Sequence, residues 1–571
     1  MAIVSMRVWT LPTLALLLVT CSAPEKSRDR QGLGGTYFGG VFNANETEEL
    51  RGLFPHSLVQ AASHRVAAQV FEGLVRFDQE DLSVVPALAD SWTIDPTKTV
   101  YTFKLHPGVR FHDDPCFPEG VGREFTADDV VSSFTALCTY GPLNQMFWLF
   151  QDKVMGANAH HAATAAGEAG PGVKGIEVLD PLTVRISLTT PSPSFLQVLA
   201  HQGCWIFPKE LVEHYGELAL WHPVGTGPFR LKTYTKGEVM VLERSPGYWG
   251  KDELGNALPF LDAIRYTFVK DKVKELQEFE KGHLSVIYEL PVDRTDVLRS
   301  ASRFQVQTIP GLTVQFYGFN MRAAPFSDPR IRRAFSMAID RQMLVDSVLN
   351  GLALPAEHGV VAPGFESYPY EMVPGTTFDP AGARKLLEEA GHPGGTGLPT
   401  VHLQVNNDGF GYVQVAGVVQ SMLERNLGVR VVTSVLPAEQ HFDRVEAGRA
   451  QFWREGWIVD HPDPENFLAL FYGKNAPADT TEPSYLNSTR YRNARFDSLF
   501  AQALRTDGQA ERMALLAGAE RQLMEDVVIA PLYHERSVRL LQPWVRDLPI
   551  NGMEYRDLRG VWFDPEARAK D

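Results

Sequence analysis

The sequence predicts an α/β fold that is divided into two or three domains. Its 571 residues exceed the length at which a single hydrophobic core stops growing. Segments with strand-like alternation recur along the chain, and segments with helical apolar periodicity lie between them. In the second half, a strand at 401–406, a helix at 413–427 and a strand at 429–435 follow one another, an order that predicts parallel pairing.

The first elements are short. A strand is expected at 36–43, and a helix that runs into a strand is expected at 66–78. Apolar and polar side chains then alternate over 101–105, which is typical of a half-buried strand. Residues 106–108 are His-Pro-Gly, a turn sequence, because proline fixes φ and glycine accepts a positive φ. A hairpin with its return strand at 109–111 is therefore expected.

A helix should follow this hairpin. Thr126 suits the N-cap with Asp129 at the third helical position, a variant of the capping box. The Ala/Gly/His-rich stretch at 157–172 predicts a surface loop, and the alternation at 182–188 predicts a strand. Residues 223–250 predict an irregular glycine-rich turn followed by two strands.

The second half contains several capped helices. Pro329 suits the first helical position with Asp328 as N-cap, and an apolar stripe follows that belongs to a core. Three arginines of this helix are expected to face water: Arg330, Arg332 and Arg333. Another capped helix is expected from Pro380 to Gly391. Near the C-terminus, Leu540 and Leu541 suit a strand.

The first 20 residues have the features of a signal peptide. Arg7 is the only charge before the apolar run from Val8 to Val19, and this run is too short to cross a bilayer core, which needs about 20 residues. Leu18-Val19-Thr20-Cys21 is similar to a lipobox, in which Cys21 would be lipidated, although Thr20 stands where Gly, Ala or Ser is usual. Ordinary cleavage nearby, which would release a free periplasmic protein, is the alternative. Residues 21–35 predict a flexible tether.

Composition limits the classes of partner. A charged fraction of 22% and a hydrophobic fraction of 44% describe an ordinary globular protein, and a net charge of −15 argues against nucleic acid. Besides Cys21, the chain has three cysteines, an odd number that leaves at least one of these thiols unpaired. Cys116 and Cys138, rather than Cys204, are the disulfide that we expect. No ligand spacing suggests a metal, and we expect no cofactor.

Several segments together resemble one family. They are the predicted hairpin within 86–113, FTADDVVSSF, GTGPF with the later YWG, and NMRAAPFSDPRIRRAFSMAIDR. These are similar to the family 5 extracytoplasmic solute-binding proteins, which deliver peptides, and in some members nickel, haem or oligosaccharides, to ABC importers. The resemblance extends from about residue 36 to residue 563.

The resemblance implies a two-lobe periplasmic-binding-protein fold, with mixed sheets flanked by helices and a ligand cleft between the lobes. Lobe I is expected at 36–268, with an inserted subdomain at about 75–176. Lobe II is expected at 269–536, and residues 537–571 should return to lobe I.

The resemblance also suggests where a ligand is held. An extended peptide can add main-chain hydrogen bonds, so its terminal charges are what require dedicated partners. Asp460 in Gly-Trp-Ile-Val-Asp matches the aspartate that holds a peptide's α-amine, and Trp457 would form an apolar wall. Arg454 matches an arginine that can pair with a short peptide's carboxylate. Arg444 matches a second such arginine if a one-residue insertion is allowed, and Tyr412 matches another polar contact.

Structural roles are the alternatives for these residues. Asp460 could pair with Arg454 or cap the turn before Pro462, and Trp457 could belong to a core. Asp463 before Pro464 is interpreted as a turn former.

We expect a monomeric, lipid-anchored peptide-binding component that works with the permease and ATPase of an ABC importer. Its contact with the membrane would be the lipid anchor only. Three other functions remain open: the same fold with an oligosaccharide or a metal chelate as cargo, a sensory lipoprotein, and a secreted hydrolase. The hydrolase has the least support, because neither Gly-x-Ser-x-Gly nor His-Glu-x-x-His occurs.

Overall fold

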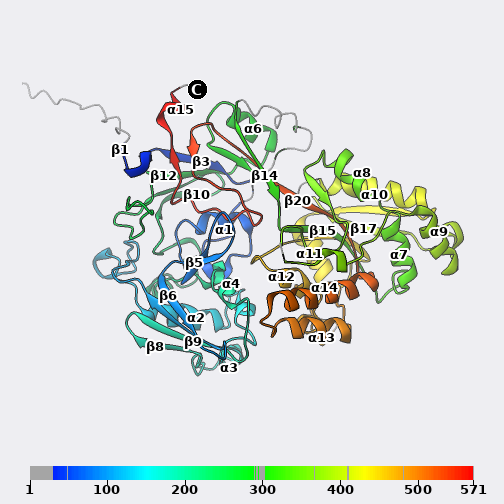
Figure 1. Ribbon diagram of the computed structural model, residues 1–571, viewed down its shortest axis with the longest axis horizontal. Coiled ribbons are helices and arrows are strands. Elements are labelled where there is room, and N and C mark those ends of the chain that lie inside the picture. The colour runs from blue at the N-terminus through cyan, green and yellow to red at the C-terminus, as the bar shows by residue number, and fades with distance from the viewer. Residues whose placement is uncertain are drawn as a thin grey trace, which may run out of the picture.

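The computed structural model describes residues 30–569, except 48, 289, 291–293, 295–302, 366, 408–410 and 480. The predicted signal peptide at 1–20, Cys21 and the tether as far as residue 29 lie outside the described residues. The chain forms two lobes (Figure 1). Lobe I carries the blue and cyan segments and the red C-terminal end, whereas lobe II carries the yellow and orange segments. Within the described residues, every helix is too short or too polar to cross a membrane.

Lobe I contains two four-stranded sheets. The first has the order β10-β11-β12-β3, in which only β12 and β3 are parallel. The second has the order β6-β7-β9-β8 and is antiparallel. Their strands are β3 (Val41–Asn45), β6 (Ala89–Ile94), β7 (Val100–Leu105), β8 (Ile176–Asp180), β9 (Thr183–Ser187), β10 (Phe229–Thr235), β11 (Val239–Arg244) and β12 (Ala263–Thr267). The helices around them are α1 (Ala61–Ala67), α2 (Ala127–Cys138), α3 (Ala157–Ala165), α4 (Phe195–Leu199), α5 (Lys209–Tyr215) and α15 (Pro565–Arg568).

Among the described residues, this lobe also has three two-stranded ribbons. They pair β1 (Arg30–Gln31) with β2 (Tyr37–Phe38), β4 (Val75–Phe77) with β5 (Val84–Pro86), and β21 (Val545–Arg546) with β22 (Trp562–Phe563).

Lobe II is built on an eight-stranded mixed sheet with the order β13-β20-β15-β19-β17-β18, and β14 and β16 also pair with β20. Its strands are β13 (Val286–Tyr288), β14 (Gln305–Pro310), β15 (Thr313–Phe319), β16 (Ala353–Pro355), β17 (Val401–Asn406), β18 (Val431–Leu436), β19 (Phe452–Ile458) and β20 (Ile529–Leu541). The helices of lobe II are α7 (Pro329–Met337), α8 (Arg341–Met343), α9 (Pro380–Glu389), α10 (Tyr412–Leu427), α11 (Ala438–Glu446), α12 (Pro464–Leu468), α13 (Ala494–Ala503) and α14 (Gln509–Glu525).

Strand β20 joins the two lobes. Its first half pairs with β15 and its second half pairs with β13 and β14, so one continuous strand runs from lobe II toward lobe I (Figure 1). Ser285, just before β13, exchanges hydrogen bonds with Asn43 of β3 at 3.0 and 2.8 Å. The chain after β20 then packs into the apolar core of lobe I through Trp544, Val545 and Phe563, among others. The predicted boundaries at 36–268, 269–536 and 537–571, with the subdomain at about 75–176, remain a proposal.

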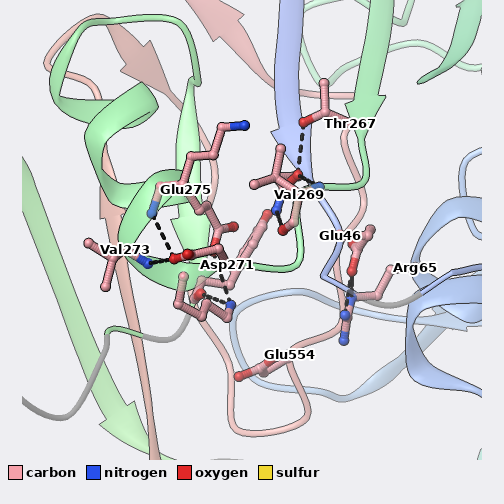
Figure 2. Close-up of polar contacts among 12 residues, drawn as sticks. Glu46, Arg65, Thr267, Val269, Asp271, Val273, Glu275 and Glu554 are labelled. Atoms are coloured by element: carbon pink, nitrogen blue, oxygen red, sulfur yellow. Dashed lines mark hydrogen bonds and ion pairs between the residues drawn. The ribbon is translucent and has the colours of Figure 1, made fainter. Parts of the chain in front are cut away.

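Polar side chains fix the chain where it leaves lobe I after β12 (Figure 2). The Asn45 side chain donates to the Val269 carbonyl at 3.0 Å and accepts from the Val269 N–H at 2.8 Å. Asp271 then caps α6 (Lys272–Glu280) by accepting from the N–H groups of its first turn. Beside them, Arg65 forms an ion pair with the buried carboxylate of Glu46. These contacts hold the lobe I side of the connection in a defined conformation.

Three local predictions are confirmed. Helix α2 begins after Thr126, which forms the capping box with Asp129. Helix α7 begins at Pro329, and the Asp328 side chain accepts from the N–H of Arg330. Strands β17 and β18 pair in parallel.

Two secondary-structure predictions are wrong. Strand β7 pairs with β6 and β9, so the predicted return strand at 109–111 does not form, although Val109 and Phe111 are buried. The predicted loop at 157–172 begins with the helix α3, because alanine has the highest helix propensity.

The predicted tether is wrong for its last residues. Strand β1 pairs with β2, and the N–H of Leu33 donates to the side chain of Asn256 at 2.8 Å. This part of the chain therefore belongs to lobe I.

Arg332 does not face water as predicted. It is 6% exposed, and its guanidinium donates to the carbonyls of Phe326, Asp526 and Val527. Two of these carbonyls lie just after α14, so Arg332 satisfies groups that the helix end leaves without an intrahelical partner.

The expected disulfide between Cys116 and Cys138 is not formed, and both residues and Cys204 are free thiols. Cys138 is buried at the end of α2 and Cys204 is also buried, whereas Cys116 lies in a loop beside Asp114. Closeness in sequence does not bring Cys116 and Cys138 together. Burial raises the pKa of Cys116 and Cys138 to about 12, so both stay protonated at neutral pH.

Candidate ligand-binding site between the lobes

The predicted site residues lie on β19 and on the segments around it. Strand β19 pairs with β15 on one side and with β17 on the other, which makes it a central strand of the sheet. Arg454 and Trp457 belong to this strand, and Asp460 follows its end. The short helix α12 begins four residues later, and Asp463 caps it.

Asn466 of α12 holds Trp457 and Asp460 together. Its side-chain oxygen accepts from the indole N–H of Trp457 at 2.7 Å and from the backbone N–H of Asp460 at 3.0 Å. Its side-chain nitrogen lies 3.4 Å from Asp460 Oδ2 and 3.3 Å from His461 Nδ1. Asn466 is only 5% exposed, whereas the side chain of Asp460 is 26% exposed. Buried Asn466 thus orients the carboxylate of Asp460, and part of this carboxylate remains accessible.

Sequence reasoning missed Asn466. It follows a predicted turn and has no pattern that distinguishes it from an ordinary helical asparagine.

Lobe I approaches this site through the segment around α4, which faces α12 (Figure 1). Nε2 of His201 lies 3.7 Å from Asp460 Oδ1. Nearby, the hydroxyl of Ser194 donates to Glu465 Oε2 at 3.0 Å. A third contact between the lobes is the exposed ion pair of Lys98 with Asp507 at 3.1 Å. The two lobes are therefore in contact beside Asp460.

A buried ion-pair network links the start of α12 to Arg512 of α14. Arg512 donates to both oxygens of Asp463 at 2.7 and 2.9 Å and to Glu465 at 2.8 Å. Asp463 also accepts from the N–H of Glu465, which agrees with its interpretation as a turn and cap former. Burial lowers the pKa of His461, although the nearby carboxylates oppose this shift. His461 is therefore neutral at neutral pH.

The structure brings Arg454 and Tyr412 together. The guanidinium carbon of Arg454 lies 3.5 Å from the centroid of the Tyr412 ring. Its Nε donates to Gln315 Oε1 at 3.0 Å, and its Nη1 donates to Asn406 Oδ1 at 3.2 Å. Arg454 is 7% exposed, so these contacts hold a nearly buried cation with amide oxygens. Among the described residues, the basic side chain that lies within 4.0 Å of the Asp460 carboxylate is His201 rather than Arg454.

Arg444 and Arg454 contact side chains on the same face of β17. It is in the last turn of α11, is exposed, and donates to Gln404 Oε1 at 2.8 Å. Gln404 and Asn406 are two residues apart on β17, so their side chains point to the same face. This region therefore carries two positive charges, Arg444 and Arg454.

Trp457 is partly exposed beside another accessible aromatic ring. Its ring centroid lies 6.4 Å from that of Tyr485, which is 59% exposed. Together with Asp460, these groups can bind a ligand that has a cationic end and an apolar side chain.

Comparisons with known proteins agree with this architecture. The sequence model described as "Bacterial extracellular solute-binding proteins, family 5 Middle" matches residues 83–479. The periplasmic oligopeptide-binding protein OppA of Salmonella typhimurium is 28% identical over 512 residues, which cover 88% of each chain. The glutathione-binding protein GsiB of Pectobacterium atrosepticum is 28% identical over 492 residues, covering 85% of this chain and 87% of that one.

Solved structures confirm the two-lobe α/β fold. The murein tripeptide-binding protein MppA of Escherichia coli has a TM-score of 0.76 at 26% identity and covers 92% of this chain and 98% of its own. A periplasmic oligopeptide-binding protein of Borrelia burgdorferi has a TM-score of 0.77 at 25% identity, over 92% of this chain and 100% of its own.

Proposed function

Because the chain belongs to the bacterial extracellular solute-binding proteins of family 5, we propose that it captures short peptides between its lobes for an ABC importer. The observation that carries the proposal is the carboxylate of Asp460, which Asn466 orients at the junction of the lobes and leaves 26% exposed. A peptide's α-ammonium is a cation that such a carboxylate can pair with. Relatives that are named for oligopeptide and glutathione binding support this class of cargo.

Arg454, which lies six residues before Asp460, and Arg444 suit the peptide's carboxylate. Along an extended chain, Arg454 and Asp460 stand at most about 20 Å apart, which is the reach of roughly six residues. Arg444 is exposed and Arg454 adds a second positive charge close to it. Cargo that spans both ends is therefore a short peptide, with Trp457 beside one of its side chains and Tyr412 beside Arg454.

The remaining parts of the proposal concern assembly and location. The protein acts as a monomer without catalysing a reaction, and its closed form is recognised by the permease and ATPase subunits of the importer. Cys21 anchors it to the membrane through a lipid. Mass spectrometry of the mature N-terminus tests the anchor, because Cys21→Ser should abolish a lipid adduct that the wild type carries. A wild-type N-terminus without lipid contradicts it.

Isothermal titration tests the cargo. We expect heat of binding with a dipeptide, trialanine or glutathione and none with cellobiose. Heat with cellobiose and none with any peptide contradicts the proposal and favours a sugar-binding function. Turnover of a peptide that disappears on mutation of Asp460 would instead indicate an enzyme.

A further inference from the structure

A buried histidine of lobe I faces the candidate ammonium site. His201 is 2% exposed, and its Nε2 has no hydrogen-bond partner among the described residues. Asp460 Oδ1 in the other lobe lies 3.7 Å from this nitrogen. This separation exceeds the 2.7–3.2 Å typical of a hydrogen bond. A buried polar atom without a partner is costly, so such an atom in a ligand site calls for an explanation.

The surroundings of His201 fix the orientation of its ring. Nδ1 accepts a hydrogen bond from the backbone N–H of Gly203 at 3.1 Å. The ring also packs against Trp148 in a T-shaped arrangement, with centroids 5.5 Å apart and an interplanar angle of 77°. Because Nδ1 is an acceptor, the proton of the neutral imidazole resides on Nε2. The atom that faces Asp460 is therefore a donor.

A donor beside a carboxylate selects one kind of ligand group. An ammonium has only donors, so it can pair with Asp460 but not with His201 Nε2–H. The oxygen next to the ammonium in an α-aminoacyl unit is an acceptor, and it stands about 3 Å from the nitrogen by standard backbone dimensions. Asp460 and His201 thus present one acceptor and one donor at a spacing that suits this unit.

We propose that His201 is a specificity-determining residue that donates through Nε2 to the first carbonyl or carboxylate oxygen of the cargo. This inference rests on the proposed function, since it assumes that Asp460 binds the ammonium. The ligand then connects lobe II through its nitrogen and lobe I through its oxygen. Binding would recognise an α-amino acyl group rather than any amine, and would favour the closed form by joining the lobes.

A cycle of two protein variants and two ligands tests the donor role. The ligands are trialanine and its analogue in which an E-alkene replaces the first amide, so that the ammonium stays and the carbonyl oxygen is absent. By calorimetry, His201→Leu should weaken trialanine about fivefold to tenfold, the range of one hydrogen bond, and leave the analogue within twofold. His201→Gln keeps a donor near the Nε2 position and should recover most of the loss. His222→Leu, an exposed histidine of the same lobe, should change neither affinity.

Each outcome has a distinct meaning. Equal losses for both ligands overturn the donor role and make His201 a ligand-independent contact between the lobes. Full affinity of His201→Leu for trialanine overturns it as well. Failure of the wild type to bind trialanine, or binding that Asp460→Ala leaves intact, contradicts the proposed function itself. If His201→Leu does not fold, the Gln variant and the wild-type comparison of the two ligands still decide the question.

Discussion

Replacing Asn466 with leucine tests whether this residue orients the ligand site or only stabilises the fold. Leucine has the same branched shape and the same number of heavy atoms, but it cannot accept from the indole N–H of Trp457 or from the backbone N–H of Asp460, which Asn466 now binds at 2.7 and 3.0 Å. Leaving both donors without an acceptor should cost about 2–6 kcal/mol of unfolding free energy, at about 1–3 kcal/mol for each. The carboxylate of Asp460 also loses its contact with the side-chain nitrogen. We therefore expect the affinity for trialanine to fall about tenfold or more, because the carboxylate is no longer oriented.

The matched control for this variant is Asn256→Leu. Asn256 is 7% exposed in lobe I, accepts from the N–H of Leu33 at 2.8 Å and donates to the Leu33 carbonyl at 3.0 Å. It should lose comparable stability in scanning calorimetry and keep its affinity in titration calorimetry at 25 °C. If Asn466→Leu also keeps its affinity within twofold, Asn466 stabilises the fold only, and the reasoning about the site is wrong.

Two further predictions concern charge. Asp460→Ala should weaken a free-amine peptide roughly tenfold to a hundredfold, the value of a hydrogen bond to a charged group, and should weaken its N-acetylated form much less; equal losses in titration would remove the ammonium role. Burial lowers the pKa of His534 to about 4, against 6.5 in the unfolded chain, so below pH 6.5 only the unfolded state takes up the proton. His534 should therefore reduce stability by about 2 kcal/mol between pH 6.5 and 5. In urea unfolding at these two pH values, His534→Asn should lose correspondingly less stability between pH 6.5 and 5 than the wild type. An equal loss of stability in both proteins would contradict the buried neutral state of His534.

Local patterns predicted many of the elements but not their partners. The capping box at Thr126 and the strand–helix–strand order from 401 to 435 depend on neighbouring residues, and both were predicted correctly. The alternation around residues 101–111 correctly indicated buried side chains, but alternation does not specify which strand pairs with which. Arg332 has the spacing of an exposed residue, yet it binds carbonyls near the end of α14 that only the tertiary fold brings close.

The candidate site divides in the same way. The family resemblance pointed to Asp460, Trp457 and Arg454 because a short sequence motif carries them. Asn466 and His201 act through contacts that depend on α12 and on the approach of the other lobe. No periodicity or spacing in the sequence records such contacts.

The packing of the C-terminal segment has a consequence for the order in which the protein matures. Residues that leave the ribosome last, such as Trp544 and Phe563, fill the interior of the lobe that was begun first. In the sequence, lobe II lies between the first part of lobe I and this C-terminal segment. We therefore expect the core of lobe II to be complete before that of lobe I. A chain that stops after Leu541 should then leave lobe I open to protease and lobe II resistant, and equal resistance of both would refute this order. In the cell, lobe I is synthesised first but could complete its core only after the C-terminal segment has been synthesised. Until then it would depend on protection from degradation.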